Sequence, residues 1–360
     1  MLFNVEIDSG DYLSGYLVCD GFDEVARLIV SNDGATVYEG SADLLRVPLV
    51  AAGRHSTGQC GFEIGEASVP GLAAMQDLAI HDAATGTLVY RRRKAHHLAR
   101  RIFRLETHLF PLWRLDGALN AKFQYAANRI EAAGRETTTQ MFLLNHVDSV
   151  YLSGRLLYRS FAYQIEGHFD VVFTMHHPYE ELAERLIVLA QVKTSGSAIL
   201  GLRENMSLES TMAFAQSLPL DDETRLRRAL LDMPQGVARV LANPVTRQLT
   251  TSAPEEMPAK SAVSRALSTL SGFAVVGLRR APQAFDAAIS ELCGLEAPAP
   301  PTPPLPGVAA LARMLKRCRE ADWLIEHDLA LYAHVADAWR KVGGAKAPVT
   351  ASGPVTKGAV

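Results

Sequence analysis

The sequence predicts an α/β protein in which a small antiparallel β-sandwich precedes a larger domain with a parallel sheet flanked by helices. Up to about residue 92, short apolar runs are separated by Asn/Asp-Gly turns, a pattern typical of antiparallel strands. From residue 101 onward, apolar runs of strand length alternate with helical patterns, which indicates a parallel sheet. We expect a β-sandwich domain over 1–95, an α/β domain over 96–342 and a disordered tail over 343–360.

The composition is that of a globular protein with a sizeable core, since 48% of the 360 residues are hydrophobic and 21% are charged. The net charge of −3 gives no reason to expect nucleic acid as a partner. No apolar run of about 18 residues and no leader pattern occurs, so we expect a cytoplasmic protein without a transmembrane segment. The four cysteines lack Cys-x-x-Cys spacing, which predicts free thiols.

Turn signals divide the first domain into its expected strands. Asp20-Gly21 and Asn32-Asp33-Gly34 suit turns that need a positive φ. The apolar runs lie at 12–13, 15–19, 27–30, 36–38, 61–64, 78–80 and 87–90. A basic run from Arg91 to Lys94 follows and marks the expected boundary. This domain could position a glycan or form a homodimer interface, and its sequence does not separate the two.

The second domain has four expected strands, at 101–105, 149–152, 170–175 and 274–278. An amphipathic helical segment begins at Pro111, and its apolar positions are Leu112, Leu115, Leu119, Phe123 and Ala127. A helix after the third strand has the inner stripe Leu182, Leu186 and Leu189. Helical pattern dominates over 207–249, 262–270 and 283–293, and two further helices reach about residue 342.

Three ordered segments of this domain resemble blocks of the bacterial carbohydrate sulfotransferase family. They are Asn243-Pro-Val-Thr-Arg247, the strand Phe273–Leu278 ending in Val-Gly-Leu, and Asp328-Leu-Ala-Leu-Tyr332. The segment Arg46–Gly53, followed by Gly58–Phe62, also resembles a β-domain found beside surface-polysaccharide enzymes, with Arg46-Val-Pro48 in place of the usual Arg-Pro-Asp. The resemblance implies a sulfotransferase-like P-loop fold over about 100–342 and a transferase of polysaccharide biosynthesis that acts on a carbohydrate acceptor.

The family holds its donor, 3′-phosphoadenosine 5′-phosphosulfate, with a phosphate loop after the first strand, and that loop is degenerate here. The loop normally carries Lys, Gly and Ser/Thr, whereas this chain reads Glu106-Thr107-His108, without Gly or Lys. No Gly-x-x-x-x-Gly-Lys-Ser/Thr motif occurs elsewhere. Of the residues in this loop, the resemblance leaves Thr107 and His108 as candidates for contact with the donor.

The family's second donor device, an Arg-x-Pro turn followed by a helical Ser, is also altered. His176-His177-Pro178 stands where the turn is expected, and Glu184 falls at the position of the Ser. A carboxylate about 4 Å from a phosphate costs several kcal/mol at an effective dielectric near 20. The donor therefore stays an open question, since the resemblance implies it and Glu184 argues against it.

Further candidates for anion binding follow the second strand and lie in the matched Asn-Pro-x-Thr-Arg segment. Ser153 and Arg155 could contact phosphate, sulfate or a uronic acid carboxylate, although Arg155 could equally pair with a nearby acid. Arg247 could contact the donor, or it could only brace a helix capped by Asn243 and Thr246.

His176 and His177 are the candidates for a general base on a sugar hydroxyl, because imidazole titrates near neutrality. Adjacent residues at a strand end point in opposite directions, so only one of them can face a site. The candidate partners are Glu106, His108, His146, Glu181 and Glu184. Without a His pair at i, i+4 or an Asp-x-Asp motif, the sequence predicts no metal site.

Two functions are therefore open. The first is a sulfotransferase-like transferase with an atypical donor site, which requires Arg155, Arg247 and one of the two histidines to meet at a cleft. The second is a non-catalytic protein of the same fold that binds glycan or partner enzymes, in which Glu106 and Glu184 occupy the phosphate positions. The two functions therefore differ in what occupies the phosphate positions, which is the donor in the first and the carboxylates of Glu106 and Glu184 in the second.

Overall fold

The computed structural model describes residues 1–341 except 22–23, 146, 193–198, 298 and 300. The predicted tail over 343–360 and the candidate residue His146 lie outside the described residues. The chain forms two compact units, the first made of 1–102, 116–153 and 164–168, and the second made of 103–115, 154–163 and the residues from 169 onward. The domain boundary near residue 95 stays a prediction.

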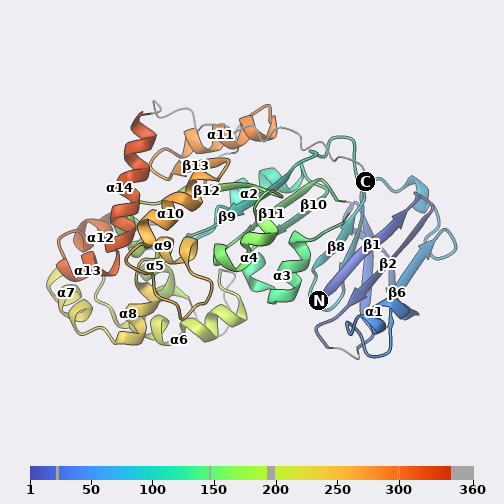
Figure 1. The fold of residues 1–360 in the computed structure, drawn as a ribbon, viewed down its shortest axis with the longest axis horizontal. Helices are drawn as coiled ribbons and strands as arrows, with labels where there is room; N and C mark the ends of the chain where they lie inside the picture. Colours follow the sequence, from blue (N-terminus) through green and yellow to red (C-terminus); the bar gives the residue numbers. More distant parts are fainter. Residues whose placement is uncertain (22–23, 146, 193–198, 298, 300, 342–360) are drawn as a thin grey trace. The chain divides into compact units, whose positions relative to one another are not determined.

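Two four-stranded antiparallel sheets make up the N-terminal region of the first unit, as predicted (Figure 1). One has the order β1-β2-β6-β5 and the other β4-β3-β7-β8. Asp33 and Gly34 adopt positive φ in the turn between β3 and β4, as the Asn-Asp-Gly pattern indicates. The bounds are Leu2–Asp8 (β1), Tyr12–Val18 (β2), Arg27–Asn32 (β3), Ala35–Ser41 (β4), Leu44–Leu45 (β5), Gln59–Gly65 (β6), Leu78–Asp82 (β7) and Leu88–Arg91 (β8).

A five-stranded sheet with the order β10-β11-β9-β12-β13 follows. β10 pairs with β11 in parallel, and β12 pairs with β13 in parallel. The bounds are Arg101–Leu105 (β9), Tyr125–Asn128 (β10), Val150–Gly154 (β11), Asp170–Met175 (β12) and Val275–Leu278 (β13). The prediction of a parallel sheet flanked by helices is confirmed.

The helical segment expected from Pro111 is shorter than predicted. Helix α2 (Trp113–Asn120) ends before Phe123, and Ala127 lies in strand β10. Phe123 and Tyr125 lie beyond the end of the helix but are still buried in the core, so the apolar spacing continues past the helix. Periodicity alone therefore extended the predicted helix into a strand.

Helix α5 (Pro178–Gln191) lies at the centre of the second unit's core. Leu182, Leu186 and Leu189 are almost wholly buried, so the predicted inner stripe is confirmed. The helices whose side chains share this core are α6 (Leu202–Ser217), α7 (Glu223–Leu231), α8 (Gln235–Leu241), α12 (Val308–Leu315) and α13 (Arg319–Leu324). The pattern over 207–249 is divided by breaks that include Pro219 and Pro234, and α9 begins at Pro244, because proline cannot continue a helix but suits its first turn.

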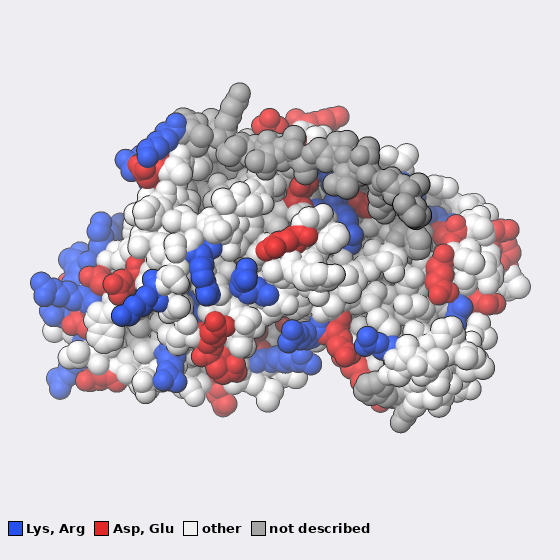
Figure 2. Space-filling view, in the orientation of Figure 1, with Lys and Arg blue, Asp and Glu red and all other residues white. Residues whose placement is uncertain are grey.

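The remaining elements are α1 (Val47–Ala51), α3 (Arg135–Phe142), α4 (Tyr158–Ile165), α9 (Pro244–Thr250), α10 (Ala262–Ser271), α11 (Pro282–Cys293) and α14 (Glu326–Lys341). Among the described residues, no helix has the length and apolar character needed to cross a membrane. On the face drawn in Figure 2, Lys and Arg are interspersed with Asp and Glu, in keeping with the small net charge.

Candidate functional site

The loop after β9 carries a buried carboxylate, Glu106, that accepts hydrogen bonds from backbone amides of the same loop. Glu106 accepts hydrogen bonds from the amides of His108 and Leu112, each at 3.2 Å, and forms an ion pair with Arg104. Burial alone would raise the pKa of Glu106, but Arg104 and His108 lower it to about 2. The carboxylate is therefore ionised and held by the loop at neutral pH.

A second carboxylate reaches the same loop from helix α5. Glu184 accepts a hydrogen bond of 3.2 Å from the amide of Phe110. The amides at 108, 110 and 112 thus all donate to carboxylates of this chain. A phosphate-binding loop would offer such amides to its ligand.

The turn between β12 and α5 separates its two histidines. Pro178 occupies the start of α5, where its missing N–H and fixed φ suit the first helical turn. The buried His176 lies beside Glu180 and Glu184, with Nε2 at 3.3 Å from Glu184 Oε2. His177 instead packs against the rings of Tyr179 and Tyr332. Only His176 joins the group of buried acids.

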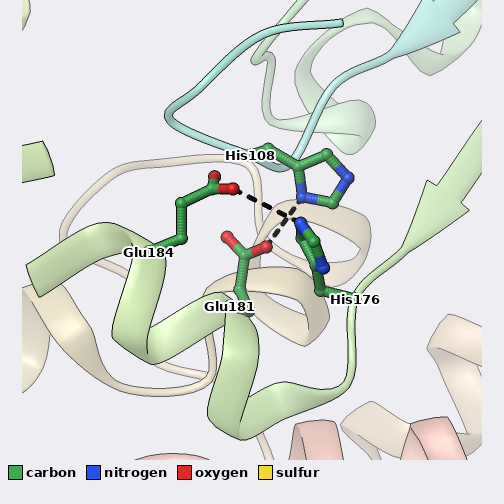
Figure 3. A group of neighbouring side chains, drawn as sticks. All are labelled: His108, His176, Glu181 and Glu184. Atoms are coloured by element: carbon green, nitrogen blue, oxygen red, sulfur yellow. Dashed lines mark hydrogen bonds and ion pairs between the residues drawn. The ribbon is translucent and has the colours of Figure 1, made fainter. Parts of the chain in front are cut away.

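His108, His176, Glu181 and Glu184 form a compact cluster, called the His/Glu cluster below (Figure 3). Nδ1 of His108 lies 2.8 Å from Glu181 Oε2, and the rings of His108 and His176 are 4.3 Å apart between centroids. Arg185 donates through Nε to Glu181 Oε1 at 2.8 Å. Burial would lower the pKa of His176, but Glu180 and Glu184 raise it to about 9.

One nitrogen or oxygen from each of these four side chains lies within 4.8 Å of the others, close enough to share a metal ion. Among the described residues this is the one group of His, Cys, Asp or Glu side chains with that property. The sequence offered no spacing that predicts it, because His108 follows β9, His176 follows β12, and only Glu181 and Glu184 share a helix.

A cavity of about 250 Å³ in the second unit is lined by three arginines, Arg155, Arg185 and Arg247, and by one carboxylate, Glu204. Arg155 forms a bidentate pair with Glu204, with Nη2 at 2.9 and 2.8 Å from the two oxygens. Burial lowers the pKa of Arg247, and the neighbouring charge of Arg185 lowers it further. We call this cavity the arginine pocket.

The other predicted site residues have structural partners. Thr107 is fully buried, and its hydroxyl oxygen lies 3.4 Å from His108 Nδ1. Ser153 belongs to the first unit and lies 3.1 Å from the side-chain oxygen of Asn128. Arg247 donates to the carbonyls of Arg239 and Val240, so the bracing role foreseen for it is present alongside its place in the pocket.

Two of the segments that resemble sulfotransferases bind each other. The buried carboxylate of Asp328 accepts from the amides of Val245 and Thr246 and from the Thr246 hydroxyl, at 2.6 to 3.1 Å. In return, Asn243 Oδ1 accepts from the amides of His327 and Asp328. We call this arrangement the α9–α14 latch, and it gives the matched residues a structural role.

Sequence reasoning missed Arg185 and Gln248 as members of this region. Arg185 follows Glu181 by four residues, a helical spacing that does favour an ion pair. Gln248 donates to the carbonyl of Glu106 at 2.6 Å, a contact between distant segments that no local pattern indicates. Comparison with models of known protein families and with curated proteins finds no match to this chain, so the sulfotransferase resemblance stays a prediction.

Proposed function

We propose that the protein is a non-catalytic binder of an anionic ligand, which it holds in the arginine pocket, and that it does not use a nucleotide donor. The observation that carries this proposal is the occupation of the loop amides at 108, 110 and 112 by Glu106 and Glu184. From the sulfotransferase resemblance, the expected ligand is an acidic carbohydrate.

A nucleotide phosphate at this loop would have to displace two buried carboxylates. Each of them accepts amide hydrogen bonds, and Glu106 is also paired with Arg104. Removing one partner of such a buried pair costs about 3–5 kcal/mol, and a phosphate left beside the carboxylates would be repelled. This balance disfavours binding of the sulfotransferase donor.

The arginine pocket offers the opposite electrostatics. Three guanidiniums and one carboxylate line it, with Arg155 paired to Glu204 and Arg185 paired to Glu181 outside the pocket. Planar guanidiniums bind carboxylate, sulfate and phosphate through paired hydrogen bonds. Its volume of about 250 Å³ lies below the usual range for a site that encloses a whole cofactor. A single charged group, such as the carboxylate of a uronic acid residue, suits it better.

Calorimetric titration tests this function with two probes, which are 3′-phosphoadenosine 5′-phosphate and a glucuronate-containing oligosaccharide. We expect binding of the oligosaccharide only, weakened about tenfold in Arg247→Gln, because a charged hydrogen bond is worth about 1.5–3 kcal/mol. The matched control is Arg228→Gln, an exposed arginine outside the pocket. Micromolar binding of the nucleotide, or unchanged oligosaccharide affinity in Arg247→Gln, would contradict the proposal.

The transferase alternative requires His176 to act as a general base. With its pKa raised to about 9, this imidazole holds a proton at pH 7 and cannot accept another. If the alternative is nevertheless correct, the double substitution His176→Ala with His177→Ala abolishes group transfer to an acceptor sugar. Absence of any transfer by the unmodified protein, with the usual donor supplied, supports the binding function instead.

A further inference from the structure

We propose that the His/Glu cluster is a binding site for one divalent transition-metal cation of the zinc class, with a structural role in the second unit. The proposed ligands are one nitrogen each from His108 and His176 and one oxygen each from Glu181 and Glu184. This inference is separate from the proposed function, since none of the four proposed ligands lines the arginine pocket, although Arg185 of that pocket pairs with Glu181.

The geometry of the cluster fits a single ion. Zinc ligands lie about 2.0–2.2 Å from the metal, so neighbouring ligand atoms in a tetrahedral site are roughly 3.3 Å apart. Here His176 Nε2 and Glu184 Oε2 are 3.3 Å apart, and His108 Nδ1 and Glu181 Oε2 are 2.8 Å apart. All four ligand atoms lie within 4.8 Å of one another, so small side-chain rotations would complete the set. Figure 3 shows both rings directed toward the two carboxylates.

Unsatisfied ring nitrogens give a second, independent observation. Nε2 of His108 and both nitrogens of His176 are buried and make no hydrogen bond of good geometry with the described residues, although the two His176 nitrogens lie 3.3 and 3.7 Å from oxygens of Glu184 and Glu180. The whole residue His108 is 0% exposed, and His176 is 7% exposed. Buried polar atoms without a partner cost about 1–3 kcal/mol each. A metal ion bound to one nitrogen of His176 would satisfy an atom that the protein leaves without a hydrogen bond.

The charges around the cluster also favour a cation. The buried carboxylates of Glu106, Glu181 and Glu184 exceed the two neighbouring guanidiniums, Arg104 and Arg185, by one negative charge. Glu180, at the rim beside His176, adds another. A divalent cation that displaces the proton of His176 would balance these two charges, because histidine binds metals as the neutral imidazole.

The identity of the ligand atoms limits which metals the cluster could bind and indicates the role of the ion. Two imidazoles with two carboxylates suit zinc and similar divalent ions, whereas the absence of thiolates from the cluster argues against copper(I) and iron–sulfur clusters. All four side chains are buried, so the proposed site is shielded from solvent. Closed sites of four protein ligands are structural, and catalytic ones keep a position for water or substrate.

Zinc titration of protein that has been stripped with a chelator tests the site, with Co²⁺ as a spectroscopic probe. We expect one equivalent of Zn²⁺ to bind and raise the Tm, and Co²⁺ to give the visible d–d bands of a low-symmetry site. Glu184→Gln preserves shape while removing one charge, and we expect it to lower the Zn²⁺ affinity by more than about tenfold. His177→Gln is the matched control, because its ring lies next in sequence yet packs on Tyr179 and Tyr332.

Circular dichroism first establishes that each variant is folded, so that lost affinity is not mistaken for lost structure. A folded wild-type protein that binds neither Zn²⁺ nor Co²⁺ would overturn the proposal. Equal Zn²⁺ affinity in wild type and Glu184→Gln, or an equal loss in His177→Gln, would overturn it as well. Failure of oligosaccharide binding with intact Zn²⁺ binding would count against the proposed function alone.

Discussion

The second unit contains two buried groups of polar side chains, the α9–α14 latch and the His/Glu cluster, which differ in how completely their polar atoms are hydrogen-bonded. In the α9–α14 latch, Asp328 accepts three hydrogen bonds and Asn243 returns two, so the two segments satisfy each other. In the His/Glu cluster the carboxylates have donors, but three ring nitrogens make no hydrogen bond with the described residues. The latch therefore satisfies its own hydrogen-bonding groups, whereas the His/Glu cluster leaves ring nitrogens that a ligand could contact.

This difference bears on which residues carry function. The latch is built from two of the segments that resemble sulfotransferases, and it is complete without any ligand. Three members of the His/Glu cluster, His108, His176 and Glu184, stand where the sequence departs from that family's pattern. The proposed metal site therefore depends on residues that the resemblance does not predict.

The largest expected effect comes from breaking the latch. Asp328→Ala leaves the amides of Val245 and Thr246 and one hydroxyl without an acceptor, and we expect a loss of about 3–5 kcal/mol in the free energy of unfolding. Urea denaturation measures it. Asp337→Ala, on the same helix with a half-exposed side chain, should change stability by less than about 0.5 kcal/mol. A loss below about 1 kcal/mol for Asp328→Ala would show that the latch is dispensable.

Glu181→Gln should have the next largest effect, because it weakens the contacts to His108 and Arg185 while keeping the side chain's shape. We expect a loss of about 2–3 kcal/mol in the free energy of unfolding. If the cluster binds metal, the loss is greater in the presence of Zn²⁺ than in chelator, which separates the site from a purely structural ion pair. Equal losses under both conditions would remove Glu181 from the ligand set. Glu209→Gln, at an exposed position of α6, is the control.

Asp286 in α11 is a buried carboxylate that belongs to neither group. Its Oδ2 has no hydrogen bond with the described residues, and burial raises its pKa to about 6, against an opposing effect of Arg279. The native state then binds a proton more tightly than the unfolded chain, so this group's stabilising contribution is lost as the pH rises from about 4 through 6. Asp286→Asn should therefore stabilise the protein by about 2 kcal/mol at pH 8 and by much less at pH 4. Thermal unfolding at the two pH values measures the difference, and a gain independent of pH would contradict the assignment.

The smallest expected effect concerns the arginine pocket. Its lining includes Arg185 from α5, the helix of the His/Glu cluster, and Arg247 from α9, a helix of the latch. Glu204→Gln removes the carboxylate that pairs with Arg155, and we expect it to raise the affinity for an anionic oligosaccharide about threefold to tenfold. Calorimetry compares it with Glu209→Gln, an exposed position on the same helix. Weaker binding in Glu204→Gln would indicate that the Arg155–Glu204 pair shapes the pocket and does not compete with the ligand.

The sequence by itself determined the elements whose burial follows a simple period. Strands β9 and β12 have the predicted bounds, and the leucine stripe of α5 is buried as expected, because side chains that alternate or recur every third or fourth residue report one buried face. The four cysteines are free, as their spacing indicated. Strand β10 was missed because Ala127 was assigned to the helical segment predicted from Pro111, and β1 was missed although Phe3, Val5 and Ile7 alternate with polar residues.

Only the tertiary structure decided which polar residues meet. Glu106 and His108 come from the loop after β9, His176 from the end of β12, and Glu181 and Glu184 from α5, so their convergence depends on the pairing of distant strands and on the packing of α5. The same holds for Asp328 and Thr246, which lie 82 residues apart in the chain. Local patterns record which face of an element is buried, whereas hydrogen bonds and metal ligands depend on distances of a few ångström that only the folded chain sets.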